Sequence, residues 1–132
     1  MDIYAEEIID HYEHPHNKGR MENASASMHE HNMVCGDDIT IYIKVKGNKV
    51  EDIKFDGNGC AISTASASML TDYAKGKSLD ELERMGVSDI IGLMGVDPGP
   101  ARLHCATISL KALKEAIFLY MHKEPDAKTR SL

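Results

Sequence analysis

Three cysteines placed far apart along the chain constrain its fold more than any other feature of the sequence. Cys35, Cys60 and Cys105 each lie in a separate segment, and no two of them form a C-x-x-C pair. An odd number of thiols cannot all close into disulfides within one chain, and the spacing argues against a thioredoxin-type redox site or a zinc ribbon. If the three thiols act together, the fold must bring three distant segments to one place.

The composition indicates one ordinary globular domain, residues 1–132. Hydrophobic residues make up 42% of the chain and charged residues 27%, which allows a core without disulfides. The net charge of −6 at pH 7 opposes binding to nucleic acid or to an anionic membrane, because such surfaces require clustered Lys and Arg. No apolar run approaches the roughly 18 residues of a membrane-spanning helix. The N-terminus lacks a signal-peptide pattern and unpaired thiols suit a reducing compartment, so we expect a cytoplasmic protein.

Hydrophobic periodicity predicts a β-hairpin in the first half of the chain. Residues 39–46 alternate between apolar and polar side chains, as a half-buried strand does. Gly47-Asn48 indicates a hairpin turn. The apolar positions of the return strand, 50–56, change parity after Val50, so we predict a bulge near Glu51-Asp52.

Helix signals occupy most of the remaining chain. Small residues dominate the helix that follows the hairpin, which allows close packing against a neighbour. The last helix has apolar residues on two sides and must pack in two directions, against the sheet and against another helix or a second subunit. A short edge strand is expected near 27–32. The helices are expected over 3–13, about 61–75, from a cap at Ser78, from a cap at Ser88 to about 94, and over about 100–122 with Pro100 at its first position.

Each cysteine has both a functional and a plain structural interpretation. Cys35-Gly36-Asp37 places a carboxylate two residues after a thiol, but a buried Cys followed by an Asp in a turn explains it equally well. Cys60 precedes a helix, whose N-terminal dipole favours the thiolate, although a small apolar side chain also suits a tight corner. Cys105 follows His104 near a helix start, where adjacent side chains point about 100° apart.

Together, these residues form a set of ligands with a clear chemical preference. Three thiolates with an imidazole and a carboxylate suit zinc or iron–sulfur chemistry and not calcium or magnesium. A structural zinc site more often has four permanent ligands, whereas a replaceable fourth ligand makes a site labile, as a carrier requires. The pairs His14/His16 and His29/His31 could also bind a metal, but we interpret them as solvated loop residues.

At these residues the chain resembles the IscU/NifU-type iron–sulfur cluster assembly scaffolds. The resemblance covers nearly the whole chain, with the motifs in order and at compatible spacing. It implies an α+β fold with a three-stranded antiparallel sheet, helices packed on one side and a long C-terminal helix. The segments that carry it are Pro15-His16-Asn17-Lys18-Gly19, Cys35-Gly36-Asp37, Gly57-Asn58-Gly59-Cys60-Ala61-Ile62-Ser63, Ser66-Ala67-Ser68-Met69, Lys75-Gly76-Lys77-Ser78-Leu79-Asp80-Glu81 and His104-Cys105.

The resemblance implies a scaffold and sulfur acceptor instead of an enzyme. A nascent cluster, most often 2Fe–2S, is expected to assemble from iron and sulfur supplied by a cysteine desulfurase and to pass to apo iron–sulfur acceptor proteins. The implied ligands are Cys35, Cys60 and Cys105, with Asp37 and His104 as the remaining functional positions, and Zn²⁺ is expected to fit the same site. Whether a monomer or a homodimer forms the site, and whether Cys35 or Cys105 accepts the persulfide, stays open.

Two alternative functions remain, one suggested by differences from the family's sequence pattern and one by the reactivity of a single thiol. Residues 60–63 and 65–69 resemble the SufU branch, so a zinc-bound sulfurtransferase that relays persulfide is the second hypothesis, although the chain lacks the SufU insertion and keeps His104. Residues 97–103 differ from the Leu-Pro-Pro-Val-Lys segment of the branch served by a dedicated chaperone, so the resemblance does not extend to that partner. A Cys–His hydrolase needs only one thiol and an oxyanion hole, and no nucleophile-elbow pattern occurs.

Overall fold

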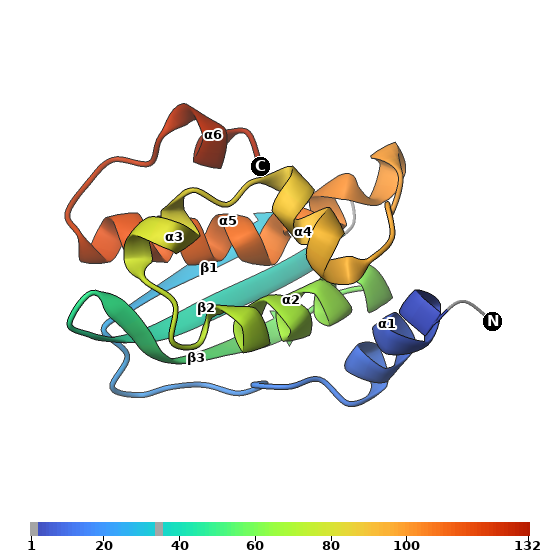
Figure 1. Ribbon diagram of the computed structural model, residues 1–132, viewed down its shortest axis with the longest axis horizontal. Helices are drawn as coiled ribbons and strands as arrows, with labels where there is room; N and C mark the ends of the chain where they lie inside the picture. The colour runs from blue at the N-terminus through green and yellow to red at the C-terminus, as the bar shows by residue number, and fades with distance from the viewer. Residues whose placement is uncertain (1–2, 34–35) are drawn as a thin grey trace.

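A three-stranded antiparallel sheet in the order β1-β2-β3 carries the helices on one face (Figure 1). The computed structural model describes residues 3–33 and 36–132. The strands are β1 (Ala26–Asn32), β2 (Asp37–Lys46) and β3 (Lys49–Asn58). Alternate residues of β2 are buried, from Asp37 through Ile43, while those between them are partly exposed. The α+β fold expected from the resemblance is confirmed, and so is the edge strand near 27–32.

The bulge expected in the hairpin is present. Lys44 faces Asp52 but Val45 faces Val50, so Glu51 is the extra residue of β3. The extra residue puts Val50 on the same face of the sheet as Ile53 and Phe55, and all three are buried. The whole inner face of the hairpin is therefore apolar and available to the helices.

The expected helices are present, with two differences at their starts, and one short helix near the C-terminus was not expected. Ser78 caps α3 by accepting a hydrogen bond from Glu81 N–H, but Ser88 lies inside α4, whose N-cap is Gly86, because the Asp89 carboxylate reaches back to Gly86 N–H at 2.7 Å. Pro100 opens a separate 3₁₀ turn instead of the long helix. The bounds are α1 (Ile3–Glu13), α2 (Ala61–Ala74), α3 (Leu79–Glu83), α4 (Val87–Met94), η1 (Pro100–Arg102), α5 (Leu103–Tyr120) and α6 (Ala127–Arg130).

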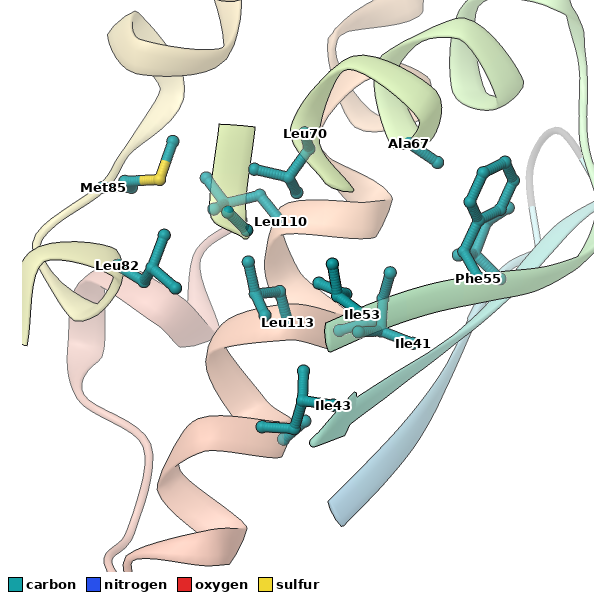
Figure 2. Close-up of a cluster of buried hydrophobic side chains, with 14 of the residues drawn as sticks. Ile41, Ile43, Ile53, Phe55, Ala67, Leu70, Leu82, Met85, Leu110 and Leu113 are labelled. Atoms are coloured by element: carbon teal, nitrogen blue, oxygen red, sulfur yellow. The ribbon is translucent and has the colours of Figure 1, made fainter. Parts of the chain in front are cut away.

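The long helix α5 is buried on both of the sides that its sequence indicated. Figure 2 shows Leu110 and Leu113 of α5 beside Ile53 of the sheet and Leu70 of α2, all within one hydrophobic cluster. Leu119 is the exception, with 52% of its surface exposed, because it lies in the last turn of α5. Within the part of the chain that the structure describes, no helix has the length and apolar character needed to cross a membrane.

Small side chains on α2 let that helix lie directly against α5. Ala65, Ala67, Ser63 and Ser68 are fully buried, and the Ser66 hydroxyl donates to the Ala106 carbonyl at 2.5 Å. This hydrogen bond satisfies a polar group that burial would otherwise leave without water. Because it joins the first halves of both helices, it holds their N-terminal ends side by side.

The first helix lies along α2 at the edge of the molecule (Figure 1). Its Ile8 packs against the core cluster. Ile9 and Tyr12 of the same helix are 46% and 47% exposed. The main contacts of α1 are with α2, so part of its apolar surface stays exposed.

Candidate metal centre

Two thiols and a carboxylate meet where three elements begin. A carboxylate oxygen of Asp37, Sγ of Cys60 and Sγ of Cys105 all lie within 4.8 Å of one another. Asp37 is the first residue of β2, Cys60 is the N-cap of α2, and Cys105 lies in the first turn of α5. The fold thus brings together residues from three distant segments. Asp37 and Cys105 are almost completely buried, at 2% and 0% exposure, while Cys60 is half-buried and gives the group its access to solvent.

Asp37 and Cys60 are joined by two hydrogen bonds. The Cys60 backbone N–H donates to Asp37 Oδ1 at 2.9 Å, and the Cys60 thiol donates to Asp37 Oδ2 at 3.8 Å. The backbone bond compensates a carboxylate that is otherwise removed from water. The thiol bond holds a proton between the two groups, and a metal ion that takes both ligands must displace it.

The Gly57-Asn58-Gly59 segment, where β3 ends just before Cys60, makes this approach geometrically feasible. Gly57 has φ +123°, and a Cβ there would lie 2.1 Å from the Asp38 carbonyl oxygen. A Cβ on Gly59 would lie 2.1 Å from Ser63 Oγ and 3.6 Å from Asp37 Oδ1. Both glycines therefore allow backbone to come closer than any side chain permits, and they place the start of α2 against the start of β2.

The start of α2 offers polar contacts to the Cys60 sulfur. Cys60 Sγ accepts a hydrogen bond from Ser63 N–H at 3.5 Å. The Ser63 hydroxyl donates to the Cys60 carbonyl at 3.1 Å. N–H groups at a helix start stabilise negative charge, so this end of α2 suits a group of anionic ligands.

Two expected site residues stand apart from this group. Cys35 lies outside the described residues. His104 is exposed and does not belong to the group, because adjacent residues of a helix point about 100° apart and Cys105 takes the inward position. His104 instead lines a hollow of about 250 Å³ together with Glu30, His31 and Lys111. Asp37, Cys60 and Cys105 are not among the residues that line this hollow.

A second group of metal-ligating side chains was missed at the sequence level. His11, His16 and Asp72 also offer ligand atoms within 4.8 Å of one another. His16 is therefore not simply a solvated loop residue, since its Nδ1 lies 2.5 Å from Asp72 Oδ2. No local motif could have revealed the group, because the two residues are 56 positions apart. His29 likewise pairs with Asp38 at 3.3 Å, in an exposed contact on the sheet.

The chain is similar to known proteins over most of its length. The family model described as "NifU-like N terminal domain" matches residues 3–127. The iron-sulfur cluster assembly scaffold protein IscU 1 of Archaeoglobus fulgidus is 40% identical over 121 residues, which cover 92% of this chain and 78% of that protein. The zinc-dependent sulfurtransferase SufU of Bacillus subtilis is also 40% identical, over 87% of this chain and 89% of its own. The solved N-terminal NifU-like protein of Brucella abortus has a TM-score of 0.76 at 22% identity, covers 92% of this chain and 96% of its own, and supports the fold.

Proposed function

Because the chain belongs to the family of NifU-like N-terminal domains, we propose that it is a scaffold on which an iron–sulfur cluster is assembled and from which the cluster passes to apo iron–sulfur proteins. One observation carries the proposal: Asp37, Cys60 and Cys105 converge at the starts of β2, α2 and α5. A scaffold binds its cargo and releases it, so it needs no group that turns over a substrate.

The cargo on this proposal is a 2Fe–2S cluster held by Cys35, Cys60, Cys105 and Asp37. Cys35 enters this proposal from the sequence, in which it precedes Asp37 by two residues. Three thiolates and one carboxylate supply the four protein positions that such a cluster uses. His104 is the alternative fourth ligand, and it would have to turn inward from its exposed position.

Asp37 makes the site releasable on the same proposal. A carboxylate is a harder ligand than a thiolate and suits iron–sulfur clusters less well. Its hydrogen bonds to Cys60 give it another partner as soon as the cluster leaves. Cys60 and the cargo therefore compete for the Asp37 carboxylate, which favours transfer over permanent storage.

Sulfur delivery adds a partner, a cysteine desulfurase. An acceptor thiolate attacks the outer sulfur of the donor's persulfide, the donor's S–S bond breaks, and the donor leaves as a thiolate.

We place the protein in the cytoplasm, where thiols stay reduced. Asp37, Cys60 and Cys105 come from one chain, so bringing these three together does not require a homodimer.

The relay of persulfide by a zinc-bound form is the second candidate. The equal identity to a zinc-dependent sulfurtransferase favours it, and a carboxylate with two thiols is also a suitable donor set for zinc. In this candidate zinc would occupy the same residues permanently, and the transferred species would be sulfur alone.

Anaerobic reconstitution separates the two candidates. The purified protein is incubated with ferrous iron, cysteine and a cysteine desulfurase, and iron, sulfide and zinc are measured per chain. The scaffold predicts a visible-absorbing cluster that moves to an apo-ferredoxin. Stoichiometric zinc that persists, with stimulated desulfurase turnover and no visible cluster, would favour the relay. Absence of both a cluster and stimulation would overturn both candidates.

A further inference from the structure

A cluster of two imidazoles and a carboxylate lies outside the thiol site. His11 belongs to α1, His16 follows that helix, and Asp72 belongs to α2. Asp72 is twelve residues after Cys60, which corresponds to about 18 Å along a helix at about 1.5 Å per residue. The two groups therefore lie at opposite ends of α2 and bind independently of each other.

Hydrogen bonds to neighbouring residues hold these side chains in position. The hydroxyl of Ser68, which is fully buried, lies 2.6 Å from His11 Nδ1 and accepts from His16 N–H at 2.8 Å. The Asn17 side-chain amide donates to Asp72 Oδ1 at 2.9 Å and to Thr71 Oγ1 at 3.0 Å. Such outer contacts fix ring and carboxylate orientation in metal sites; His11 and Asp72 each have one through the side chain, and the backbone of His16 is anchored to Ser68.

The arrangement leaves ligand atoms directed at one another instead of at solvent. The His11 and His16 rings have centroids 4.6 Å apart at 50°, and His16 Nδ1 lies 2.5 Å from Asp72 Oδ2. Because Nδ1 of His11 contacts the Ser68 hydroxyl, Nε2 is the ring nitrogen of His11 that is left to bind a metal ion. Two imidazoles this close would repel each other if both were protonated, whereas a shared cation would attract both.

The surroundings favour a cation. A hollow of about 450 Å³ adjoins the cluster and is lined by His11 and Asp72 together with Glu6, Glu7 and Asp10. Carboxylates gathered around one hollow raise the local concentration of cations. The side chains of His16 and Asp72 are about half exposed, at 48% and 45%, so an ion could enter without rearrangement of the core.

We propose that His11, His16 and Asp72 form a second metal site that takes one divalent first-row ion, with zinc as its representative. Two imidazoles with one carboxylate select zinc or ferrous iron over magnesium and calcium. Three protein ligands leave at least one position for water or for an incoming ligand. The site is therefore exchangeable, and its donors differ from the thiols of the cluster site. It does not depend on the proposed function.

Cobalt titration tests the site because cobalt reports the type of its ligands. The whole protein is titrated with Co²⁺ and with Zn²⁺ under anaerobic conditions. Two ions per chain are expected: one gives thiolate-to-cobalt charge-transfer absorption, and the other gives only weak d–d bands. His16→Gln and Asp72→Asn should weaken zinc at the second site by at least about tenfold and keep the charge-transfer band. His14→Gln, which alters an exposed histidine outside the cluster, should retain both ions.

A second measurement on the unaltered protein guards against misfolded variants. Nitrogen-15 NMR of the histidine rings should show zinc-dependent shifts for His11 and His16 and none for His14. Absence of any cobalt ion that gives only weak d–d bands, equal zinc affinity in His16→Gln and His14→Gln, or ring signals of His11 and His16 that do not respond to zinc would each overturn the proposal.

Discussion

The two groups of candidate metal ligands, one at each end of α2, differ in how the fold makes them. At the N-terminal end, Asp37, Cys60 and Cys105 come from the first residues of three elements and are buried or half-buried. At the C-terminal end, His16 and Asp72 are about half exposed and are oriented by side-chain hydrogen bonds. One group therefore depends on backbone geometry, and the other depends on surface contacts.

The comparison teaches that a ligand is buried in this protein where it is a thiol or where, as for Asp37, hydrogen bonds from Cys60 compensate its burial. Thiols tolerate burial because the neutral group behaves as a small apolar side chain, so the fold can enclose them near the core. Imidazole and carboxylate ligands are costly to bury without partners, and the second group remains at the surface with polar neighbours. A change in the backbone should damage the first group most, whereas a change in one polar neighbour should damage the second.

The largest expected effect is that of Cys105→Ser. A serine hydroxyl remains protonated and binds iron poorly, so reconstitution should yield no transferable cluster, while the cobalt ion with weak d–d bands should remain at the His11 group. Visible absorption and cobalt spectra measure both. Asp38→Asn, which changes a carboxylate outside the thiol group, is the matched control and should retain the cluster. Loss of both ions in Cys105→Ser would show that the two sites are not independent.

The next largest effect is expected from Gly57→Ala. The added Cβ would lie 2.1 Å from the Asp38 carbonyl oxygen at φ +123°, and strained backbone with overpacking costs about 2–4 kcal/mol in the free energy of unfolding. The strands must separate there, which displaces Cys60 from Asp37 and lowers cluster yield. Urea unfolding measures the cost. Gly92→Ala, in a helix with open space at that position, should instead gain about 0.5–1 kcal/mol. Equal stability of the two variants would contradict the close approach.

A smaller effect is expected from Ser68→Ala. The substitution removes the hydroxyl that contacts His11 and His16, so zinc affinity at the second group should fall by about tenfold. The free energy of unfolding should fall by about 1 kcal/mol through the lost hydrogen bonds. Calorimetric zinc titration and urea unfolding give both numbers. Ser88→Ala on α4, away from both groups, should leave zinc binding unchanged. Unaltered zinc binding in Ser68→Ala would mean that the surface group needs no support from α2.

The first group could be anticipated from sequence because its signals are local. The Gly57-Asn58-Gly59 turn, the helix start at Cys60 and the strand that begins near Asp37 each mark the end of an element, and element ends gather at one side of a small domain. The bulge at Glu51 was also predictable, since parity of apolar residues directly reports which face is buried. The side-chain direction of His104 was not, because a shared helix start does not decide which of two neighbours points inward.

The second group had no comparable signal. His16 meets Asp72 only because α1 packs along α2, and the exposed Ile9 and Tyr12 show that the apolar pattern of α1 does not specify that contact closely. Packing geometry between two helices depends on shape over many residues, whereas a turn or a cap depends on a few. Sequence therefore predicts a site made by element ends better than one made by helix faces.

The smallest effect concerns two carboxyl groups outside both groups, those of Glu115 on α5 and Glu30 on β1. Burial and the hydrogen bond and negative charge of Glu30 raise the pKa of Glu115 from 4.5 to about 7. The protonated form is therefore favoured by folding, so its stabilisation is complete below about pH 4.5 and is lost as the pH rises through about 7. Because the pair is only partly buried, solvent screening limits the effect to about 1 kcal/mol. Urea unfolding across this pH range should show that the free energy of unfolding decreases with pH. Glu115→Gln should reduce this pH dependence, and Glu124→Gln, at an exposed position, should leave it intact. An unchanged pH dependence in Glu115→Gln would mean that the two carboxyl groups do not share a proton.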